Sequence, residues 1–359
     1  MNSERLTRVR EGMCDAGMDA LLVGPGADYR YLTDYNIHTS ERLTALVVFQ
    51  DGGESIFTPR LEAPGAQGSG FPLVVWTEDQ QPLDLVTAAL RERGARTVGV
   101  GDHLWSRFLL GLQERLPDAQ WRTASTVIAP VRCIKSPQEI DLLRTAGAAA
   151  DVVWEHVIQL PLEGMTERAL CNRIGDLLVE QGLDGVGFVN VGSGPNGASP
   201  HHDSGDRTLQ HGDMVVMDFG GPLGGYHSDI TRTFSIGVTG AEERRAYETV
   251  REAQEFGVRA VRPGVAAGEV DQSTRTHIEA GGFGERFIHR TGHGLGLELH
   301  EPPYIIAESV EPLREGMVFS VEPGVYIPGR FGVRIEDIVV VTPTGCERLN
   351  NASRELMTV

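Results

Sequence analysis

Short apolar runs alternate with amphipathic stretches through the first third of the chain. The runs that predict buried strands lie at 19–24, 43–49, 72–76 and 97–101. Apolar residues at helical spacing cover 4–16 and 83–93. Strands that alternate with helices are typical of a layered α/β domain, so we expect a small α/β domain over residues 1–128.

A strong helix signal opens the rest of the chain, which we assign to a second domain over residues 129–359. Ser136 is suited to the N-cap, Pro137 to the first helical position, and Glu139 can close a capping box. An apolar stripe continues from there to about Ile158. Further helices are expected between Thr166 and Gly182, over 241–261 and over 268–280.

The second domain repeats itself at an offset of one hundred residues. Glycines recur in one register, where Gly164 matches Gly264, Gly182 matches Gly282, Gly192 matches Gly292 and Gly194 matches Gly294. After a small slip, the segment 211–220 resembles 314–324. The domain therefore reads as two copies of one unit, related by a pseudo-twofold axis.

The repeat also aligns two pairs of acidic residues in predicted strands. It places Asp218 opposite Glu322 and Asp229 opposite Glu336. Aspartate is depleted in strands and costly to bury without a partner, so these positions call for an explanation. If the equivalent strands of the two copies face each other, the four carboxylates converge at one place.

Four ionised carboxylates in a partly buried cleft require cations, because their mutual repulsion would otherwise protonate some of them. Two divalent ions would neutralise the four charges. Oxygen-rich ligation suits manganese best, with zinc or cobalt as alternatives. The sequence thus predicts two divalent metal ions per subunit.

Histidines in glycine-rich turns are the further candidates for this site. His293 lies between two glycines, where the backbone can bring an imidazole close to a metal. His300 follows in the same segment, and the first repeat offers His201 and His202, of which His201 is one position from matching His300. The two repeats can therefore supply one histidine each from opposite sides. The chain has neither an H-E-x-x-H zinc motif nor a G-x-S-x-G nucleophile turn.

Charge and cysteine usage exclude several classes of partner. The net charge of −18 disfavours nucleic acid and anionic membrane surfaces, which bind basic proteins. No apolar run approaches the length of a membrane span, and the charged N-terminal segment has no apolar signal core. The four cysteines lie far apart without a C-x-x-C motif, so we expect reduced thiols in a cytoplasmic protein.

Four segments of the second domain resemble the creatinase/prolidase/methionine-aminopeptidase family, the "pita-bread" metallopeptidases. They are M-D-F-G-G-P-L-G-G-Y-H-S-D-I-T-R-T-F, H-R-T-G-H-G-L-G-L-E-L-H-E, V-E-P-G-V-Y-I-P-G and V-R-I-E-D-I-V-V-V-T-P-T-G. The preceding α/β domain, with D-Y-R-Y-L-T-D-Y, is similar to the N-terminal domain of the creatinase and proline-specific branches. The resemblance implies a pita-bread fold and, most closely, a bacterial Xaa-Pro dipeptidase.

The resemblance also implies roles for individual residues. The metal ligands would be Asp218, Asp229, His293, Glu322 and Glu336, with Asp229 and Glu336 bridging the two ions. His201 and His300 would contact the scissile carbonyl and the tetrahedral intermediate, and Glu322 would carry a proton. Tyr326 and Arg334 match positions tied to proton transfer and support of the ligands. Creatinases lose these ligands, so we expect a peptidase that acts, as a homodimer, on proline-containing di- or oligopeptides.

One departure from the family leaves the substrate length open. Many prolidases carry an arginine three residues beyond the His-Glu pair of L-E-L-H-E, where it can hold a free carboxylate, and Tyr304 stands there instead. Aminopeptidase P, which accepts longer peptides, is therefore the near alternative, and a non-peptide hydrolase or a lyase is a more distant one. We expect Arg42, with Arg30 as second choice, to hold the substrate carboxylate. His202 and Tyr304 complete the expected substrate contacts.

Overall fold

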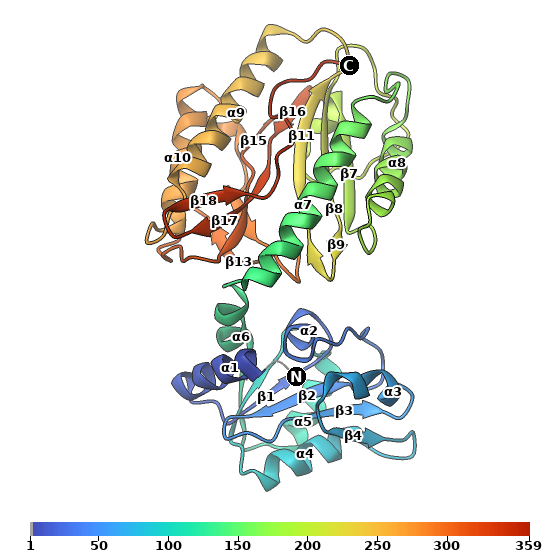
Figure 1. Cartoon of the computed structure of the whole chain (residues 1–359), viewed down its shortest axis with the longest axis vertical. Coiled ribbons are helices and arrows are strands. Elements are labelled where there is room, and N and C mark those ends of the chain that lie inside the picture. Colours follow the sequence, from blue (N-terminus) through green and yellow to red (C-terminus); the bar gives the residue numbers. More distant parts are fainter. Residues whose placement is uncertain (1–2) are drawn as a thin grey trace. The chain divides into compact units, whose positions relative to one another are not determined.

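A computed structural model describes residues 3–359 of the chain (Figure 1). The chain divides into two compact units, of which the first ends at Arg132 and the second runs from Cys133 to Val359. The boundary lies after Arg132 rather than after residue 128, because helix α6 (Ser125–Arg132) belongs to the first unit. Within residues 3–359, no helix is both long and apolar enough to cross a membrane.

The first unit is a six-stranded sheet with helices packed on it. The strand order is β4 (Leu73–Trp76), β3 (Ser55–Pro59), β2 (Ala45–Phe49), β1 (Ala20–Val23), β5 (Thr97–Val100) and β6 (Gln120–Thr123). The helices are α1 (Ser3–Ala16), α2 (Ala27–Thr33), α3 (Ala63–Ala66) with the 3₁₀ turn η1 (Gln67–Ser69), α4 (Pro82–Glu92), α5 (Ser106–Arg115) and α6. Alternate strand residues pack with the apolar faces of α4 and α5 in one core. The layered α/β domain expected from the sequence is thus confirmed.

The second unit contains two similar halves, as its sequence repeat predicts. The first half has helices α7 (Pro137–Val157) and α8 (Glu167–Glu180), and a sheet of order β11 (Ile230–Ser235), β8 (Met214–Gly220) and β7 (Phe188–Ser193). The 3₁₀ turn η2 (Gly194–Ala198) and the small hairpin β9 (Pro222–Leu223) and β10 (Tyr226–His227) complete it. The predicted capping box is present, because Ser136 Oγ accepts from the Glu139 amide at 3.3 Å and Glu139 Oε2 accepts from the Ser136 amide at 2.7 Å.

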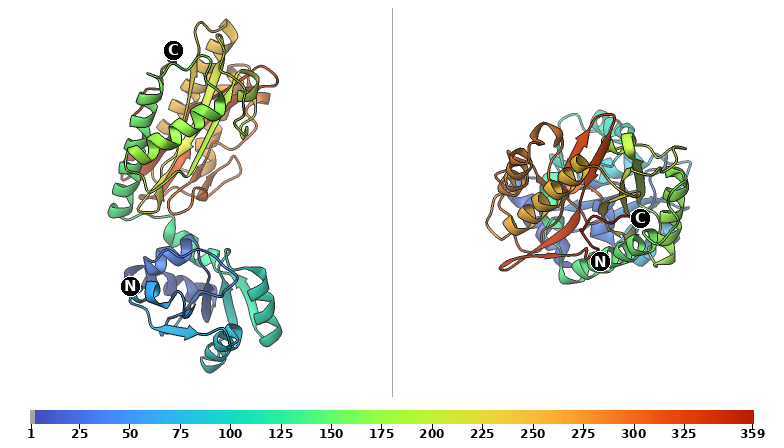
Figure 2. Two further views of the ribbon diagram at one scale, coloured as in Figure 1. Left: turned by 90° about the vertical axis from the view of Figure 1, so that its right-hand side faces the viewer. Right: turned by 90° about the horizontal axis from the view of Figure 1, so that it is seen from above.

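The second half has the same order of elements. It has helices α9 (Ala241–Ala260) and α10 (Ala267–Ala280), the 3₁₀ turn η3 (Gly284–Arg286), and a sheet of order β13 (Glu301–Ile305), β12 (Gly292–Gly294), β14 (Val318–Val321), β17 (Asp337–Thr342) and β18 (Gly345–Arg348). A hairpin of β15 (Gly324–Ile327) and β16 (Phe331–Arg334) completes it. The helices lie outside the strands in both halves (Figures 1 and 2).

Backbone geometry confirms the pseudo-twofold repeat. Gly164 and Gly264 both have φ of +85°, and Gly182 and Gly282 have φ of +89° and +83°, a region that favours glycine. Strand β8 pairs antiparallel with β11 and β7, as β14 pairs with β17 and β12. The halves meet where the Glu336 amide donates to the Thr231 carbonyl at 3.1 Å. The ends of equivalent strands therefore lie together at the centre of the unit.

Candidate metal centre

The four aligned carboxylates lie at ends of the strands that meet between the two halves. Asp218 is near the end of β8, Glu322 directly follows β14, and Asp229 and Glu336 directly precede β11 and β17. All four line one cavity of about 820 Å³ together with His293. One ligand atom each from Asp229, His293 and Glu336 lie within 4.8 Å of one another. The structure thus brings together the five residues predicted as metal ligands.

Glycines on both sides of His293 let its strand approach its neighbours. A Cβ atom on Gly292 would lie 1.8 Å from the Ser320 carbonyl oxygen, and one on Gly294 would lie 2.4 Å from the Pro302 carbonyl oxygen. The pairing of β12 with β13 shifts register between His293 and Gly294. Such an irregularity re-aims a side chain, here the imidazole of a buried histidine.

The ring of His293 is oriented as in a metal ligand. Its Nδ1 lies 3.1 Å from the Gly294 carbonyl oxygen, which assigns the proton to that nitrogen. Its Nε2 lies 3.3 Å from Glu322 Oε1 and 3.7 Å from Asp229 Oδ2. Burial lowers the pKa of His293 to about 4, so the ring is neutral at pH 7. The Nε2 lone pair is therefore directed at the carboxylates and free to bind a cation.

The carboxylates lack the partners that a buried anion needs. Within residues 3–359, Asp218 Oδ1, Asp229 Oδ1 and Glu336 Oε1 are buried and have no hydrogen-bond partner. Burial, and then repulsion from neighbouring carboxylates, raises the pKa values of Asp229 and Glu336 well above their usual range. Unpaired hard oxygen atoms beside one neutral imidazole nitrogen are a donor set that fits divalent cations.

Side chains around the candidate ligands fix their orientation. Thr231 Oγ1 donates to Glu336 Oε2 at 2.6 Å and accepts from Arg334 Nε at 3.0 Å, and Arg334 also donates to Asp218 Oδ2 at 2.7 Å. Ser320 Oγ donates to Glu322 Oε1 at 2.9 Å and accepts from the His293 amide at 3.0 Å. Such second-layer contacts hold metal ligands in place.

Sequence reasoning did not single out Thr231 or Ser320, although a signal was present. Thr231 lies two residues after Asp229, and Ser320 lies two residues before Glu322. Residues two apart in a strand share a face, so polar residues at this spacing from a ligand are the signal that could have found them.

A hydrogen-bonded chain leads from the ligands to a histidine that the sequence analysis left without a role. Arg334 Nη1 donates to the Tyr326 hydroxyl oxygen at 2.9 Å, and that hydroxyl lies 2.9 Å from His289 Nε2. His289 Nδ1 lies 2.7 Å from the Arg290 carbonyl oxygen, so Nδ1 carries the proton and the Tyr326 hydroxyl donates to Nε2. Burial lowers the pKa of His289 and raises that of Tyr326 to about 12, which keeps both neutral.

Two further histidines line the cavity. His201 lies in the turn after η2, and His300 directly precedes β13. The rings of His300 and His293 are 4.1 Å apart between centroids, at a steep angle of 76°. Partial desolvation, with His293 and Arg290 nearby, lowers the pKa of His300 to about 4. By contrast, His202 is not among the lining residues, because its Nε2 hydrogen-bonds the buried Glu167 at 2.8 Å.

The remaining two expected substrate contacts lie elsewhere. Arg42 is in the first unit, where it pairs with Glu78 at 2.7 Å and also with Glu41. Tyr304, on β13, is 39% exposed and is not among the residues that line the cavity. Its ring is covered by the guanidinium of Arg290, with the carbon atom of that group 4.6 Å from the ring centroid.

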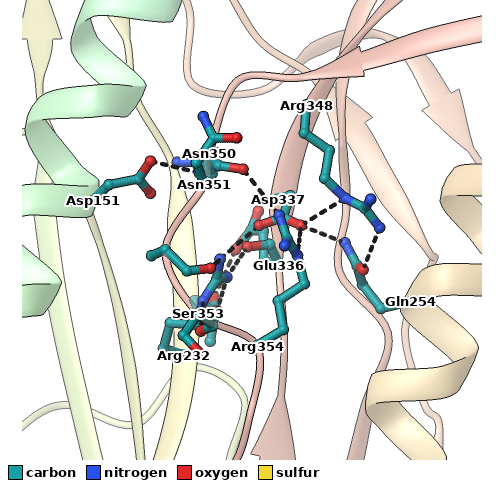
Figure 3. A network of polar contacts seen from close by, with 12 residues as sticks. Asp151, Arg232, Gln254, Glu336, Asp337, Arg348, Asn350, Asn351, Ser353 and Arg354 are labelled. Atoms are coloured by element: carbon teal, nitrogen blue, oxygen red, sulfur yellow. Dashed lines mark hydrogen bonds and ion pairs between the residues drawn. The ribbon is translucent and has the colours of Figure 1, made fainter.

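A buried polar network lies behind Glu336 (Figure 3). Asp337 is fully buried and accepts from Arg232 at 2.7 Å and from Gln254 at 3.0 Å, and it also pairs with Arg348 and Arg354. Arg232 additionally donates to the Glu336 carbonyl oxygen. Although burial opposes the charge, Arg232 and Arg354 lower the pKa of Asp337. The network fixes the backbone that carries Glu336.

Comparisons with known families agree with this architecture. Residues 5–134 match the Creatinase/Prolidase N-terminal domain, and residues 141–343 match the model of metallopeptidase family M24. The chain belongs to metallopeptidase family M24. As an M24 metallopeptidase it is an enzyme that acts on peptides, and its family uses divalent metal ions.

Individual relatives of this M24 metallopeptidase span its whole length. It is 42% identical to a "Probable dipeptidase PepE" of Mycobacterium tuberculosis over 363 residues, which covers 99% of this chain and 96% of that protein. It is 34% identical to a "Xaa-Pro dipeptidase" of Lactobacillus helveticus, with 98% of each chain covered. Its structure is similar to that of a recombinant prolidase from Thermococcus sibiricus, with a TM-score of 0.96, 37% identity and all of both chains covered. The pita-bread fold expected from the sequence is confirmed.

Proposed function

We propose that this enzyme is an Xaa-Pro dipeptidase that uses two divalent metal ions. The observation that carries the proposal is the cluster of Asp218, Asp229, His293, Glu322 and Glu336, whose unpaired carboxylate oxygens line one cavity with His201 and His300. The relatives named Xaa-Pro dipeptidase and prolidase, which match over nearly the whole chain, support the same activity.

The five residues divide naturally between two ions. All five line the cavity, and the family resemblance implies that Asp229 and Glu336 would be shared by the two ions, that Asp218 would bind one of them, and that His293 and Glu322 would complete the set. The oxygen-rich donor set favours manganese, with zinc or cobalt as alternatives. Ions bound there would polarise the scissile carbonyl and lower the pKa of the attacking water.

Side chains of the protein would transfer protons and stabilise the negative charge that develops on the carbonyl oxygen. Burial raises the pKa of Glu322, so this carboxylate is suited to accept a proton from the attacking water and to pass it on. His201 and His300 line the cavity, where their ring N–H groups can donate hydrogen bonds to the oxyanion. Arg334 and Tyr326 hold Asp218 and His289 in one connected chain.

An X-Pro bond suits this site for chemical reasons. The imide nitrogen before proline has no N–H, so recognition must come from the ring and from the substrate termini. The nitrogen must also gain a proton before it can leave, which a positioned acid such as Glu322 provides. Apolar side chains of Phe188, Val189 and Pro200 line the same cavity and can contact the proline ring.

The alternative function is aminopeptidase P activity on longer peptides. It stays open because Tyr304 stands where many prolidases have an arginine that binds the free carboxylate of the dipeptide. The deciding experiment is a substrate panel of Ala-Pro, Ala-Pro-Ala and N-acetyl-Ala-Pro, assayed with and without added manganese. Cleavage of Ala-Pro alone supports the dipeptidase, preference for the tripeptide supports the aminopeptidase, and turnover of none would overturn both.

We also propose a cellular compartment and an oligomeric state for the enzyme. Cysteines 14, 133, 171 and 346 are free thiols, as expected of a cytoplasmic enzyme. We also propose a homodimer, in which the N-terminal unit of one subunit can help to close the active site of the other. Sedimentation equilibrium would measure the mass, and a monomer at assay concentrations would exclude the dimer.

A further inference from the structure

Arg290 lines the active-site cavity and has no anionic partner within residues 3–359. It is half-buried, lines the cavity beside His289 and His300, and directly precedes the segment that carries His293. Within residues 3–359, its guanidinium makes no ion pair or hydrogen bond, and its one described contact is with the face of the Tyr304 ring. A guanidinium carries five N–H donors, so those of Arg290 are available to a ligand in the cavity that this residue lines.

Neighbouring arginines of the same half are already occupied. Arg334 is bound to Asp218, Thr231 and Tyr326, and Arg275 makes a bidentate pair with the buried Asp271 at 2.9 and 3.1 Å. Arg290 is therefore the lining arginine that is available to an incoming anion. Because Arg binds carboxylates through two parallel hydrogen bonds, a substrate carboxylate is the natural ligand for it.

Strand pairing brings Arg290 next to Tyr304, the position at which many prolidases carry an arginine. Strand β12 pairs with β13, with His293 opposite Tyr304. Arg290 lies just before β12, and its guanidinium stacks on the ring of Tyr304. The flat face of the ring supports the guanidinium through a cation–π contact. Thr291 anchors the backbone next to it, since its amide and hydroxyl both donate to Asp271 Oδ1, at 3.0 and 2.8 Å.

We propose that Arg290, supported by Tyr304, binds the free C-terminal carboxylate of an Xaa-Pro dipeptide. This inference rests on the proposed peptidase function and adds to it the residue that limits substrate length. The positive charge that many prolidases carry at the position of Tyr304 would be supplied here by Arg290, which lies two residues before β12. A peptide extended or amidated after proline lacks the carboxylate at that place, so it gains nothing from Arg290.

The test compares Ala-Pro with Ala-Pro-amide and Ala-Pro-Ala for the manganese-loaded wild-type enzyme and four variants, Arg290→Ala, Arg290→Lys, Arg42→Ala and Arg262→Ala. In Arg290→Ala we expect KM for Ala-Pro to rise about tenfold to a hundredfold, as for the loss of a charge-assisted bond, while the values for the amide and the tripeptide change little. Arg290→Lys should recover part of the loss. Arg262→Ala removes an exposed arginine of the same unit and should leave all three substrates unaffected. Metal content, measured for each variant, should stay at the wild-type value.

The outcomes separate this inference from the function on which it rests. An equal loss on Ala-Pro and its amide in Arg290→Ala, with normal metal content, would overturn carboxylate recognition by Arg290 and leave the peptidase function standing. Selective loss on Ala-Pro in Arg42→Ala but not in Arg290→Ala would assign the contact to the first unit and also overturn the inference. If the wild-type enzyme cleaves none of the three substrates, the proposed function fails and the inference fails with it.

Discussion

The Asp229 carboxylate lies buried beside Glu336 and His293, and within residues 3–359 its Oδ1 atom has no hydrogen-bond partner. A divalent cation is the partner that such an oxygen lacks. Substituting an amide removes the charge and one donor oxygen while preserving the size of the side chain. The consequences are therefore confined to the metal centre.

We expect Asp229→Asn to lose at least one ion per chain and to lower kcat/KM for Ala-Pro by at least about a hundredfold, because it removes a carboxylate proposed to be shared by both ions. Elemental analysis after gel filtration and steady-state kinetics measure the two effects. Asp184→Asn, which changes an exposed aspartate of the same unit, is the matched control and should behave as wild type. Two retained ions with near-normal turnover would exclude Asp229 as a ligand.

His201 tests the proposed stabilisation of the oxyanion. We expect His201→Ala to keep its metal and to lose about a hundredfold to a thousandfold in kcat, as for removal of one such donor. His202→Ala is the informative comparison, because His202 hydrogen-bonds Glu167 and should affect stability more than kcat. If kcat falls in His202→Ala and stays normal in His201→Ala, the two roles are reversed.

The sequence indicated the carboxylates of the candidate metal centre, but not most of the side chains that hydrogen-bond them. Asp218, Asp229, Glu322 and Glu336 could be found because the internal repeat aligns them in pairs. The hydrogen bond from Thr231 to Glu336 joins residues 105 positions apart, and no pattern in the sequence records such a contact. Arg290 was overlooked for a similar reason, since its partner Tyr304 is a neighbour only through the pairing of β12 with β13.

At the scale of elements, long helices were easier to predict than short strands. Helix α7 begins with the predicted capping box, and α8 begins after Thr166, whose hydroxyl accepts from the Ala169 amide at 3.1 Å. Strands β3 and β6 were missed, because β6 (Gln-Trp-Arg-Thr) is a largely polar, exposed edge strand and β3 is bounded by serine and proline. Edge strands are stabilised by their pairing partner, which local sequence does not reveal.

Equivalent helices of the two halves anchor the loops of the active site. Glu167 at the start of α8 accepts from the Ser193 amide at 2.8 Å, and Asp271 in α10 accepts from the Thr291 amide at 3.0 Å. Both carboxylates are fully buried. Helix α8 thus holds the backbone at the end of β7, and α10 holds the backbone just before β12. The two repeats therefore use the same kind of contact to fix the segments that lead into the site.

Asp337 connects elements that surround the centre, so its loss should destabilise the whole second unit. Asp337→Asn leaves three arginines near one neutral amide, and breaking a buried ion pair costs about 3–5 kcal/mol. Urea denaturation measures the change in the free energy of unfolding. Asp141→Asn, which removes an exposed ion pair with Arg144, should cost less than about 1 kcal/mol. Equal effects in the two variants would contradict the structural role of Asp337.

At the scale of the molecule, the metal centre links protonation to the stability of the second unit. Asp229 and Glu336 have raised pKa values because burial and neighbouring carboxylates disfavour their charged forms. Asp218 and Glu322 face them with like charge, and Arg334 faces them with opposite charge. The metal-free protein can relieve this repulsion only by taking up protons, whereas bound cations neutralise it at any pH.

The sign of the pH dependence follows from these shifts. A carboxyl with a raised folded-state pKa stabilises the fold fully below its unfolded pKa of about 4, and this stabilisation is lost as the pH rises through the folded pKa. His289, His293 and His300 have lowered pKa values, so their contribution is fully present above about pH 6.5 and is lost as the pH falls below it. Above pH 6.5 these three histidines no longer change the stability with pH, and the raised pKa values of the two carboxyls act in the direction of lower stability at higher pH.

We accordingly expect these carboxyls to lower the melting temperature of the chelated protein as the pH rises above about 4, and saturating manganese to raise it by an increment that grows with pH, because protons compete with the ions for the same oxygens. Differential scanning fluorimetry with and without a chelator measures both curves. Glu336→Gln removes one of the two carboxyls and should flatten the slope of the chelated protein. Parallel curves for the metal-free and manganese-loaded protein would show that the carboxylates and the ions are not coupled, and would contradict the metal centre itself.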